Sequence, residues 1–248
     1  MGMDSNSCRG REIKKSESLY LSYKPTPSRN PKDFMANNQY ISEPVQVFVS
    51  AINKIYPVST SAIDFVKQRA GIVQISKGSL LVNAGDNCDN LFFVCRGILR
   101  GFVKQGNKDI TTWITSEMEI VTSISGYFKK VPSIENIEAL EDCVLVSIHR
   151  DDMHFLYEKF PEVNTLVRII LERYYQDAEE RAYICRLTDA TAKYNRFIST
   201  QSALLNRIPL KYVASYLGMT LETLSRIRSR LSQQRIIPEQ GRGLADQF

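Results

Sequence analysis

The stretch IPLKYVASYLGMTLETLSRIRSRL, Ile208 to Leu231, has the pattern of two short helices joined by a tight turn. Apolar residues recur at steps of three and four in its first part. Gly218 follows directly, and a glycine there can take the left-handed conformation that ends a helix. Thr220 then suits the N-cap of a second helix, whose buried face would carry Leu224 and Ile227. This arrangement is typical of a helix-turn-helix, which can place its second helix in the major groove of DNA.

The exposed side of the second helix carries groups that bind DNA. The guanidinium of Arg226 can donate two hydrogen bonds to a guanine, and the carboxylate of Glu222 can accept a hydrogen bond from a cytosine. Because Glu222 lies four residues before Arg226, the two side chains can also form an ion pair. Arginines further along the helix are better placed to contact phosphates. Such contacts position the protein on the DNA but do not depend on the base sequence. A basic helix can also be the solvated face of an ordinary bundle, but the cap, the turn glycine and the arginines together favour DNA binding. The predicted DNA-binding residues are Thr220, Glu222, Thr223, Ser225, Arg226, Arg228, Arg230 and Arg235.

The run from Glu222 to Arg226, Glu-Thr-Leu-Ser-Arg, resembles the recognition helix of the Crp/Fnr family of bacterial transcription regulators. The resemblance implies that Glu222 and Arg226 contact bases. Many members carry a base-contacting arginine just before the glutamate, where this chain has Leu221, so its base preference should differ. The family also implies an α+β chain, with an N-terminal antiparallel β-barrel or jelly roll of the cyclic-nucleotide-binding type, a long dimerisation helix and a C-terminal winged helix-turn-helix.

The sequence before the helix-turn-helix agrees with this organisation. Residues 45 to 70 have helical periodicity, and from about Gly71 to His149 short apolar runs alternate with turn signals, which favours antiparallel strands. Gly78, Gly85 and Gly97 stand where the family has turn glycines. We therefore expect an extension at residues 1–40, the barrel domain at 41–155, the dimerisation helix at 156–187 and the DNA-binding domain at 188–248.

The first forty residues are polar and contain Pro25, Pro27 and Pro31, so the sequence predicts that they are disordered. Met35 is a candidate for the true start, and the sequence leaves open whether residues 1–34 belong to the native protein. At the other end, the segment after Ile237 is short, and we expect the wing to be short or absent.

The effector site departs from the family pattern. The family's phosphate-binding cassette has a Gly-Glu pair and, about ten residues later, an arginine followed by Ser or Thr. In IVTSISGYFKKVPSIENIEAL, residues 120–140, Ser133 falls at the last of these positions, and Pro132 falls at the arginine. Because the charges that would hold a cyclic phosphate and a ribose are missing, we do not expect cyclic AMP to bind. Lys129, Lys130 and Ser133 remain the ligand-pocket candidates.

A long helix is predicted from about Pro161 to Leu187, since proline suits the first turn of a helix. A nearly heptad apolar stripe runs along it. The stripe either packs on its own barrel or forms a seam with a second chain. We favour the seam, because two helix-turn-helix units spaced by a turn of DNA bind far better than one. The stripe consists of Val163, Leu166, Val167, Ile170, Tyr174, Ala178 and Ala182.

Composition excludes several other classes of protein. The 248 residues carry a net charge of +5, which is concentrated after residue 186, where nine Lys or Arg face four Asp or Glu. The sequence contains neither an apolar run long enough to span a membrane nor an apolar signal core, and five scattered cysteines favour a reducing cytoplasm. No nucleophile and base, phosphate loop or metal-ligand spacing indicates an enzyme. We therefore expect neither a cofactor nor a metal site.

The combined prediction is a cytoplasmic, homodimeric, sequence-specific transcription regulator of Crp/Fnr type. Its expected partners are double-stranded DNA, a second copy of the chain and an unidentified small-molecule effector, with RNA polymerase as a further candidate. The alternative is a small-molecule-binding module whose helix-turn-helix no longer binds DNA. The operator, the regulated genes, the sign of regulation and the effector cannot be read from the sequence.

Overall fold

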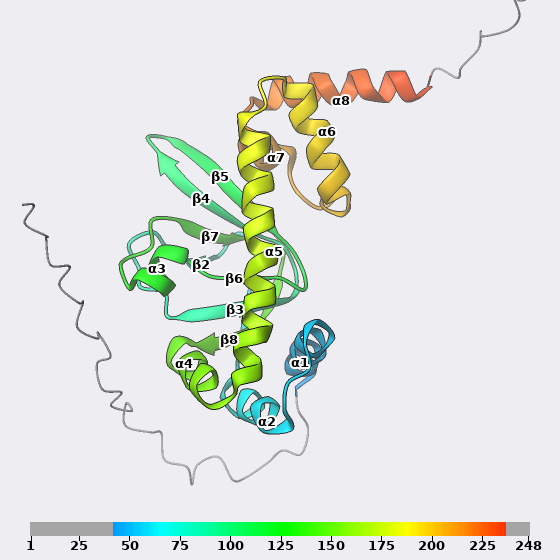
Figure 1. Ribbon diagram of the computed structural model, residues 1–248. Helices are drawn as coiled ribbons and strands as arrows, with labels where there is room; N and C mark the ends of the chain where they lie inside the picture. Colours follow the sequence, from blue (N-terminus) through cyan, green and yellow to red (C-terminus); the bar gives the residue numbers. More distant parts are fainter. Residues whose placement is uncertain (1–41, 237–248) are drawn as a thin grey trace, which may run out of the picture. The chain divides into compact units, whose positions relative to one another are not determined.

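The computed structural model describes residues 42–236, and the side chains of residues 42–233 (Figure 1). The chain begins with α1 (Glu43–Ile55) and α2 (Thr60–Arg69), continues through eight strands and ends in a series of helices. This confirms the predicted α+β class. The extension at 1–40 and the segment after residue 236, where a wing was considered, lie outside the described residues.

Two four-stranded antiparallel sheets form the barrel, with strand orders β1-β8-β3-β6 and β2-β7-β4-β5. The core between them contains Val94, Leu99, Ile137 and Leu145, which are fully buried. Buried and less buried positions alternate along most of β8, as expected when one face of a sheet is packed. The strands are β1 (Gly71–Ile75), β2 (Leu80–Val82), β3 (Asn90–Arg96), β4 (Leu99–Gln105), β5 (Lys108–Thr115), β6 (Ile120–Val121), β7 (Asn136–Ala139) and β8 (Cys143–His149).

The turn between β3 and β4 requires a glycine for two reasons. Gly97 has a φ of 105°, which other residues rarely adopt. A Cβ at this position would also lie 2.5 Å from Cys143 Sγ and 2.9 Å from the carbonyl oxygen of Asp142. The backbone of β4 can therefore approach the end of β8 only with glycine at this corner. The predicted turn glycines Gly78 and Gly85 also have positive φ values.

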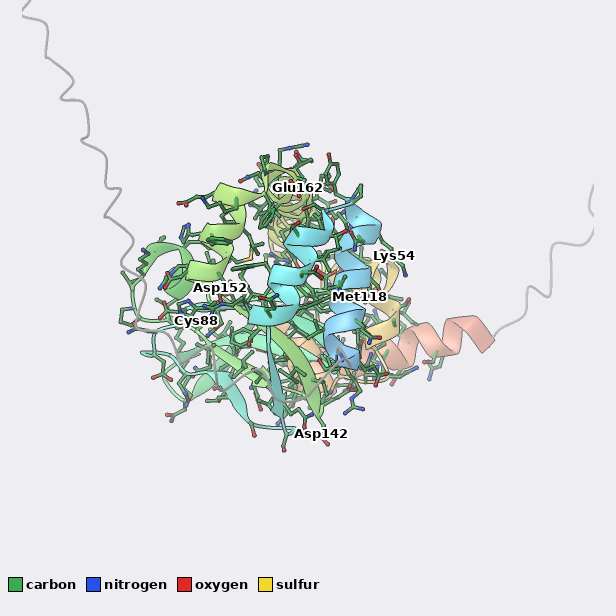
Figure 2. The ribbon with its side chains drawn as sticks, turned by 90° about the horizontal axis from the view of Figure 1, so that it is seen from below. Lys54, Cys88, Met118, Asp142, Asp152 and Glu162 are labelled. Carbon is green, nitrogen blue, oxygen red and sulfur yellow. The ribbon has the colours of Figure 1, made fainter. Side chains whose placement is uncertain are left out.

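A second core lies where α1, α2, α4 (Arg150–Lys159) and the start of α5 meet β3 and β8. Two acidic residues tie these helices together at their ends, and both are labelled in Figure 2. Asp152 accepts from Arg69 Nε at 2.8 Å, and Glu162 accepts from the Ser59 amide at 3.3 Å. Because Ser59 also caps α2, the start of α5 is fixed directly to the N-terminal helices.

The long helix α5 (Pro161–Arg186) begins at the expected proline, but its predicted stripe divides into two parts. Val163 and Leu166 are buried in the second core, with Val167 and Ile170 packed beside them. Further along, Ala178 and Ala182 are exposed. The first half of the stripe therefore packs on its own chain, so the prediction that the whole stripe forms an intersubunit seam was wrong.

After α5 comes a helical domain whose core also includes Ile98, Ile114 and Leu140 of the barrel. Phe197, Val213 and Leu224 are fully buried there, and Leu217 is 2 % exposed. Ile184 of α5 joins the same cluster, so the end of the long helix is part of this domain. The domain is built from α6 (Ala190–Gln201), a short 3-10 turn (Ser202–Leu204), α7 (Leu210–Tyr216) and α8 (Leu221–Ile236).

Candidate DNA-binding surface and effector cavity

The turn between α7 and α8 is closed by backbone hydrogen bonds around Gly218. The glycine has a φ of 65°, in the left-handed region that the sequence predicted. The amide of Gly218 donates to the carbonyl of Ser215 at 3.1 Å, and that of Met219 donates to Ala214 at 3.0 Å. These bonds satisfy carbonyls left free at the end of α7 and fix the angle at which α8 leaves the turn.

Thr220 caps α8 as predicted. Its hydroxyl accepts from the amide of Thr223 at 3.2 Å and lies 3.1 Å from the Thr223 hydroxyl. In the first turn, the backbone amide of Glu222 and the Thr220 hydroxyl lower the pKa of the Glu222 carboxyl, and the charge of Arg226 adds to this shift. Glu222 is therefore ionised at neutral pH and is ready to accept a hydrogen bond.

The face of α8 opposite its core is open to solvent. Glu222, Ser225, Arg226 and Arg230 are exposed, while Thr223 and Arg228 are half-buried. The ion pair expected between Glu222 and Arg226 does not form in the described structure, where no carboxylate lies within ion-pair distance of Arg226. Two long side chains on one solvated helix face gain little from pairing, so both stay available to a ligand.

Leu221, at the start of α8, is 41 % exposed beside this face. The backbone of Arg235 belongs to α8, but its side chain lies outside the described part of the chain. The structure therefore places the predicted base-contacting residues on one exposed surface of α8. The opposite side of the helix is buried through the apolar residues Leu224 and Ile227.

The segment that corresponds to the phosphate-binding cassette folds as α3 (Ile124–Lys129) and the loop after it. Ser133 is 3 % exposed, and its hydroxyl donates to the carbonyl of Glu135 at 2.7 Å. Lys129 and Lys130 are exposed. Ser133 is thus committed to holding its own loop, and the two lysines project into solvent rather than toward the barrel.

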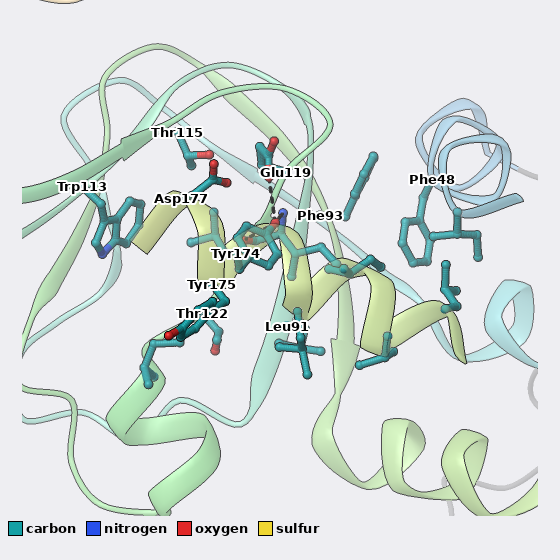
Figure 3. A pocket seen from close by; sticks show the side chains of 18 of the residues that line it. Phe48, Leu91, Phe93, Trp113, Thr115, Glu119, Thr122, Tyr174, Tyr175 and Asp177 are labelled. Carbon is teal, nitrogen blue, oxygen red and sulfur yellow. Dashed lines mark hydrogen bonds between the residues drawn. The ribbon is translucent and has the colours of Figure 1, made fainter. Parts of the chain in front are cut away.

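An open cavity of about 810 Å³ runs between the barrel and α5 (Figure 3). None of Lys129, Lys130 and Ser133 is among the described residues that line it. The lining is mainly aliphatic and aromatic. Among the described residues that form it, Arg181 is the only Lys or Arg, and Asp177 and Glu180 line the cavity with it. A cyclic phosphate needs concentrated positive charge, so this lining suits an apolar occupant better than a nucleotide.

Residues 72–160 match the family model of the cyclic nucleotide-binding domain. Over 180 residues the chain is 24% identical to the transcriptional activator protein FnrA of Stutzerimonas stutzeri, covering 68% of this chain and 73% of FnrA. It is 22% identical to the fumarate and nitrate reduction regulatory protein of Vibrio cholerae, covering 68% and 71% of the two chains. The chain is thus similar to regulators of the Crp/Fnr type. The fold agrees, since the structure of FixK2 from Bradyrhizobium japonicum superposes with a TM-score of 0.60 at 17% identity, covering 69% of this chain and 89% of FixK2.

Two polar contacts at the cavity were not predicted from the sequence. Tyr174 of α5 donates to Glu119 at 2.9 Å and accepts from the amide of Ile120 at 2.6 Å, as Figure 3 shows for Tyr174 and Glu119. Burial raises the pKa of the Glu119 carboxyl, although the bond from Tyr174 opposes this shift. The contact holds the middle of α5 against the barrel, and nothing in the spacing of these residues would have paired them.

The second contact lies beside the cassette. Trp113 Nε1 donates to Glu135 at 2.9 Å, and burial raises the pKa of the Glu135 carboxyl. The indole fits because β4 has a glycine opposite it: a Cβ at Gly101 would lie 2.2 Å from Trp113. An indole and a half-buried carboxyl group thus lie next to the cassette loop, and an ionised carboxylate disfavours a bound phosphate there.

Proposed function

We propose that this protein is a sequence-specific DNA-binding transcription regulator that acts as a homodimer. The observation that carries the proposal is α8, a capped helix whose exposed face bears Glu222, Ser225 and Arg226 above a buried apolar side. In a helix-turn-helix, residues near the start of the second helix meet the base edges of the major groove. Arg228, Arg230 and Arg235 are assigned to phosphates. The relatives named above are transcription regulators rather than enzymes, which agrees with this assignment.

The proposed dimer seam is the exposed side of α5. Its residues follow each other at steps of four, three, four and three, which is the heptad spacing of a two-chain coiled coil. Leu171 and Tyr175 are 51 % and 74 % exposed, a large apolar area for a solvated helix. A parallel partner helix would cover this area and place two helix-turn-helix units side by side. The seam consists of Leu171, Tyr175, Ala178, Ala182 and Cys185.

The seam predicts that Cys185 of one chain lies close to Cys185 of the other. In a Cys8→Ser background, mild oxidation should yield a covalent dimer on a non-reducing gel, because Cys185 is exposed. Burial raises the pKa of Cys95 and of Cys143 to about 11, so these thiols should react slowly. Cys185→Ser should remove the covalent dimer, and Ala178→Asp should prevent dimerisation by placing charges at the seam. A monomeric protein on a sizing column, without covalent dimer, would contradict the assignment.

The effector of the proposed regulator is not cyclic AMP. The cavity lining offers Arg181 as its only Lys or Arg among the described residues, and Asp177 and Glu180 stand beside it. At the cassette, Ser133 is bonded within its own loop. A cyclic phosphate would lose its hydration without gaining the charged partners that repay this loss.

The test is selection of bound sequences from a random duplex pool, at controlled salt, with and without cyclic AMP. Enrichment of a palindrome without nucleotide is the expected result, because two symmetric recognition helices read inverted half-sites. Enrichment only with nucleotide would show that the reading of the cassette is wrong. If no sequence is enriched in either condition, the rival function, a ligand-binding module that has lost its DNA role, replaces the proposal.

A further inference from the structure

Besides the apolar cluster that the two domains share, an arginine just before α7 joins the helix-turn-helix domain to the barrel. Arg207 donates to both carboxylate oxygens of Glu117 at 2.7 and 2.9 Å, and to both oxygens of Glu141 at 2.6 and 3.1 Å. Glu117 and Glu141 belong to loops at one end of the barrel. The guanidinium thus uses its planar donors on two carboxylates at once, the geometry in which such pairs are strongest.

A second group of contacts joins α7 itself to β5 and β4. The Ser215 hydroxyl accepts from the amide of Thr111 and donates to the carbonyl of Asp109, each at 3.0 Å. The ring of Tyr212 covers the guanidinium of Arg100, with 3.9 Å between them. The residues in these contacts are about a hundred positions apart in the sequence, so the contacts belong to a tertiary interface between the helical domain and the barrel.

Arg100 is prepared for this interface by the barrel. It is 2 % exposed, and its charge is balanced by Glu138 at 2.6 Å and Asp109 at 3.1 Å. Its other face lies 4.1 Å from the Phe102 ring, so the guanidinium is held between two aromatic rings, one from each domain. Stacked cations of this kind are stabilising when they are desolvated.

We propose that these contacts form a latch that holds the helix-turn-helix domain on its own barrel in a state of low DNA affinity. The latch consists of Arg207, Tyr212 and Ser215 on the helical domain and Arg100, Thr111, Glu117 and Glu141 on the barrel. The proposal rests on the proposed function, because it names how the same DNA-binding surface is controlled. Release of the latch frees the domain to turn toward DNA.

The direction of the effect follows from charge. The first helix of a helix-turn-helix crosses the DNA backbone, so an arginine just before it is well placed for a phosphate. In the latched state the guanidinium of Arg207 is bound by the carboxylates of Glu117 and Glu141. These three groups together carry one net negative charge, which lies beside α7. The guanidinium of Arg207 lowers the pKa of the Glu117 carboxyl to about 2, so this carboxylate stays ionised at every pH where DNA binding is measured. The carboxylates of the barrel and the phosphates of DNA therefore compete for one cation.

The test removes the barrel side of the latch and keeps the arginine. Glu117→Gln with Glu141→Gln should tighten binding to the selected DNA by roughly three- to tenfold, the range that two exposed ion pairs allow. The salt dependence should steepen by about one counterion per subunit, since Arg207 is then free to join a phosphate. The same pair of substitutions is also made in an Arg207→Gln background, where the latch is already open. There the gain should vanish, whereas a general effect of removing negative charge would persist in both backgrounds and would overturn the proposal.

Amide exchange gives a readout that needs no DNA. The Thr111 amide donates to Ser215, so its exchange reports docking of α7. Exchange over residues 109–115 should accelerate in the Glu117→Gln, Glu141→Gln protein and approach that of Ser215→Ala, which removes the acceptor directly. Unchanged exchange would show that Arg207 does not hold the domain and would overturn the latch. If exchange accelerates but no variant binds DNA, the proposed function fails, and the regulatory role of the latch fails with it, while the docking contact itself stands.

Discussion

Arg226→Ala should remove most of the preference for the selected operator while leaving binding to random DNA nearly unchanged. Arg226 is exposed on the second turn of α8 and carries no carboxylate partner, so its guanidinium is free to fork onto a guanine. Loss of such a base contact costs about 1–3 kcal/mol per half-site, and roughly twice that for a symmetric dimer. Fluorescence anisotropy with operator and random duplexes, at two salt concentrations, measures the difference.

The matched control for this prediction is Arg230→Ala, about one turn further along the same helix and also exposed. A phosphate contact at that position should weaken binding to both duplexes alike and reduce the salt slope by about one per subunit. Equal losses on operator and random DNA for Arg226→Ala would remove Arg226 from the base-reading set. A loss of helical signal in either variant would show that folding, and not contact, had changed.

Phe197→Ala should unfold the helical domain in a large share of molecules and abolish DNA binding with it. The side chain is fully buried in α6, and its ring lies 5.7 Å from that of Tyr216 in the helix before the turn. Removal of a buried phenylalanine costs about 3–5 kcal/mol, which is comparable with the whole stability of a small domain. Urea unfolding followed by circular dichroism, with DNA binding measured on the same samples, tests this expectation.

Phe197→Leu is the control, because leucine refills much of the space and should cost clearly less than alanine. The core of Val94, Leu99 and Leu145 lies in a different cluster, so the barrel should stay folded in both variants. Its transition should shift slightly, because Ile98, Ile114 and Leu140 of the barrel pack in the same cluster as Phe197. A change below about 0.5 kcal/mol for Phe197→Ala would be typical of a surface position and would contradict the described packing.

The helix-turn-helix could be predicted in detail because its signals are local. A left-handed glycine at 218 and a threonine cap at 220 each depend on backbone geometry within one turn of chain, and both are present as expected. The antiparallel strands were predictable for a similar reason, since apolar alternation and turn residues recur along the barrel. The choice of partner for each strand depends on distant residues and was not predicted.

The long helix shows where periodicity stops being informative. Apolar residues at helical spacing indicate which face of a helix is buried, but they do not indicate which element or which chain packs against it. Val163 and Leu166 face the same chain, and the exposed seam begins only at Leu171. The contacts of Arg207 could not be predicted either, because nothing in the sequence around this arginine indicates that its two carboxylate partners lie 66 and 90 positions away.

The 26 residues of α5 form one uninterrupted rod about 39 Å long. Tyr174 and Tyr175 are neighbours in sequence, so their side chains leave the rod about 100° apart. One is bonded to the barrel beside the cavity, and the other stands on the exposed face that we assign to the partner. A ligand in the cavity that displaced Tyr174 from Glu119 would therefore rotate α5 about its own axis. The same rotation would move the side chain of Tyr175. Ile184, near the far end of α5, packs in the same cluster as Leu224 and Ile227 of α8, so a rotation of α5 is expected to reach α8 through direct contact.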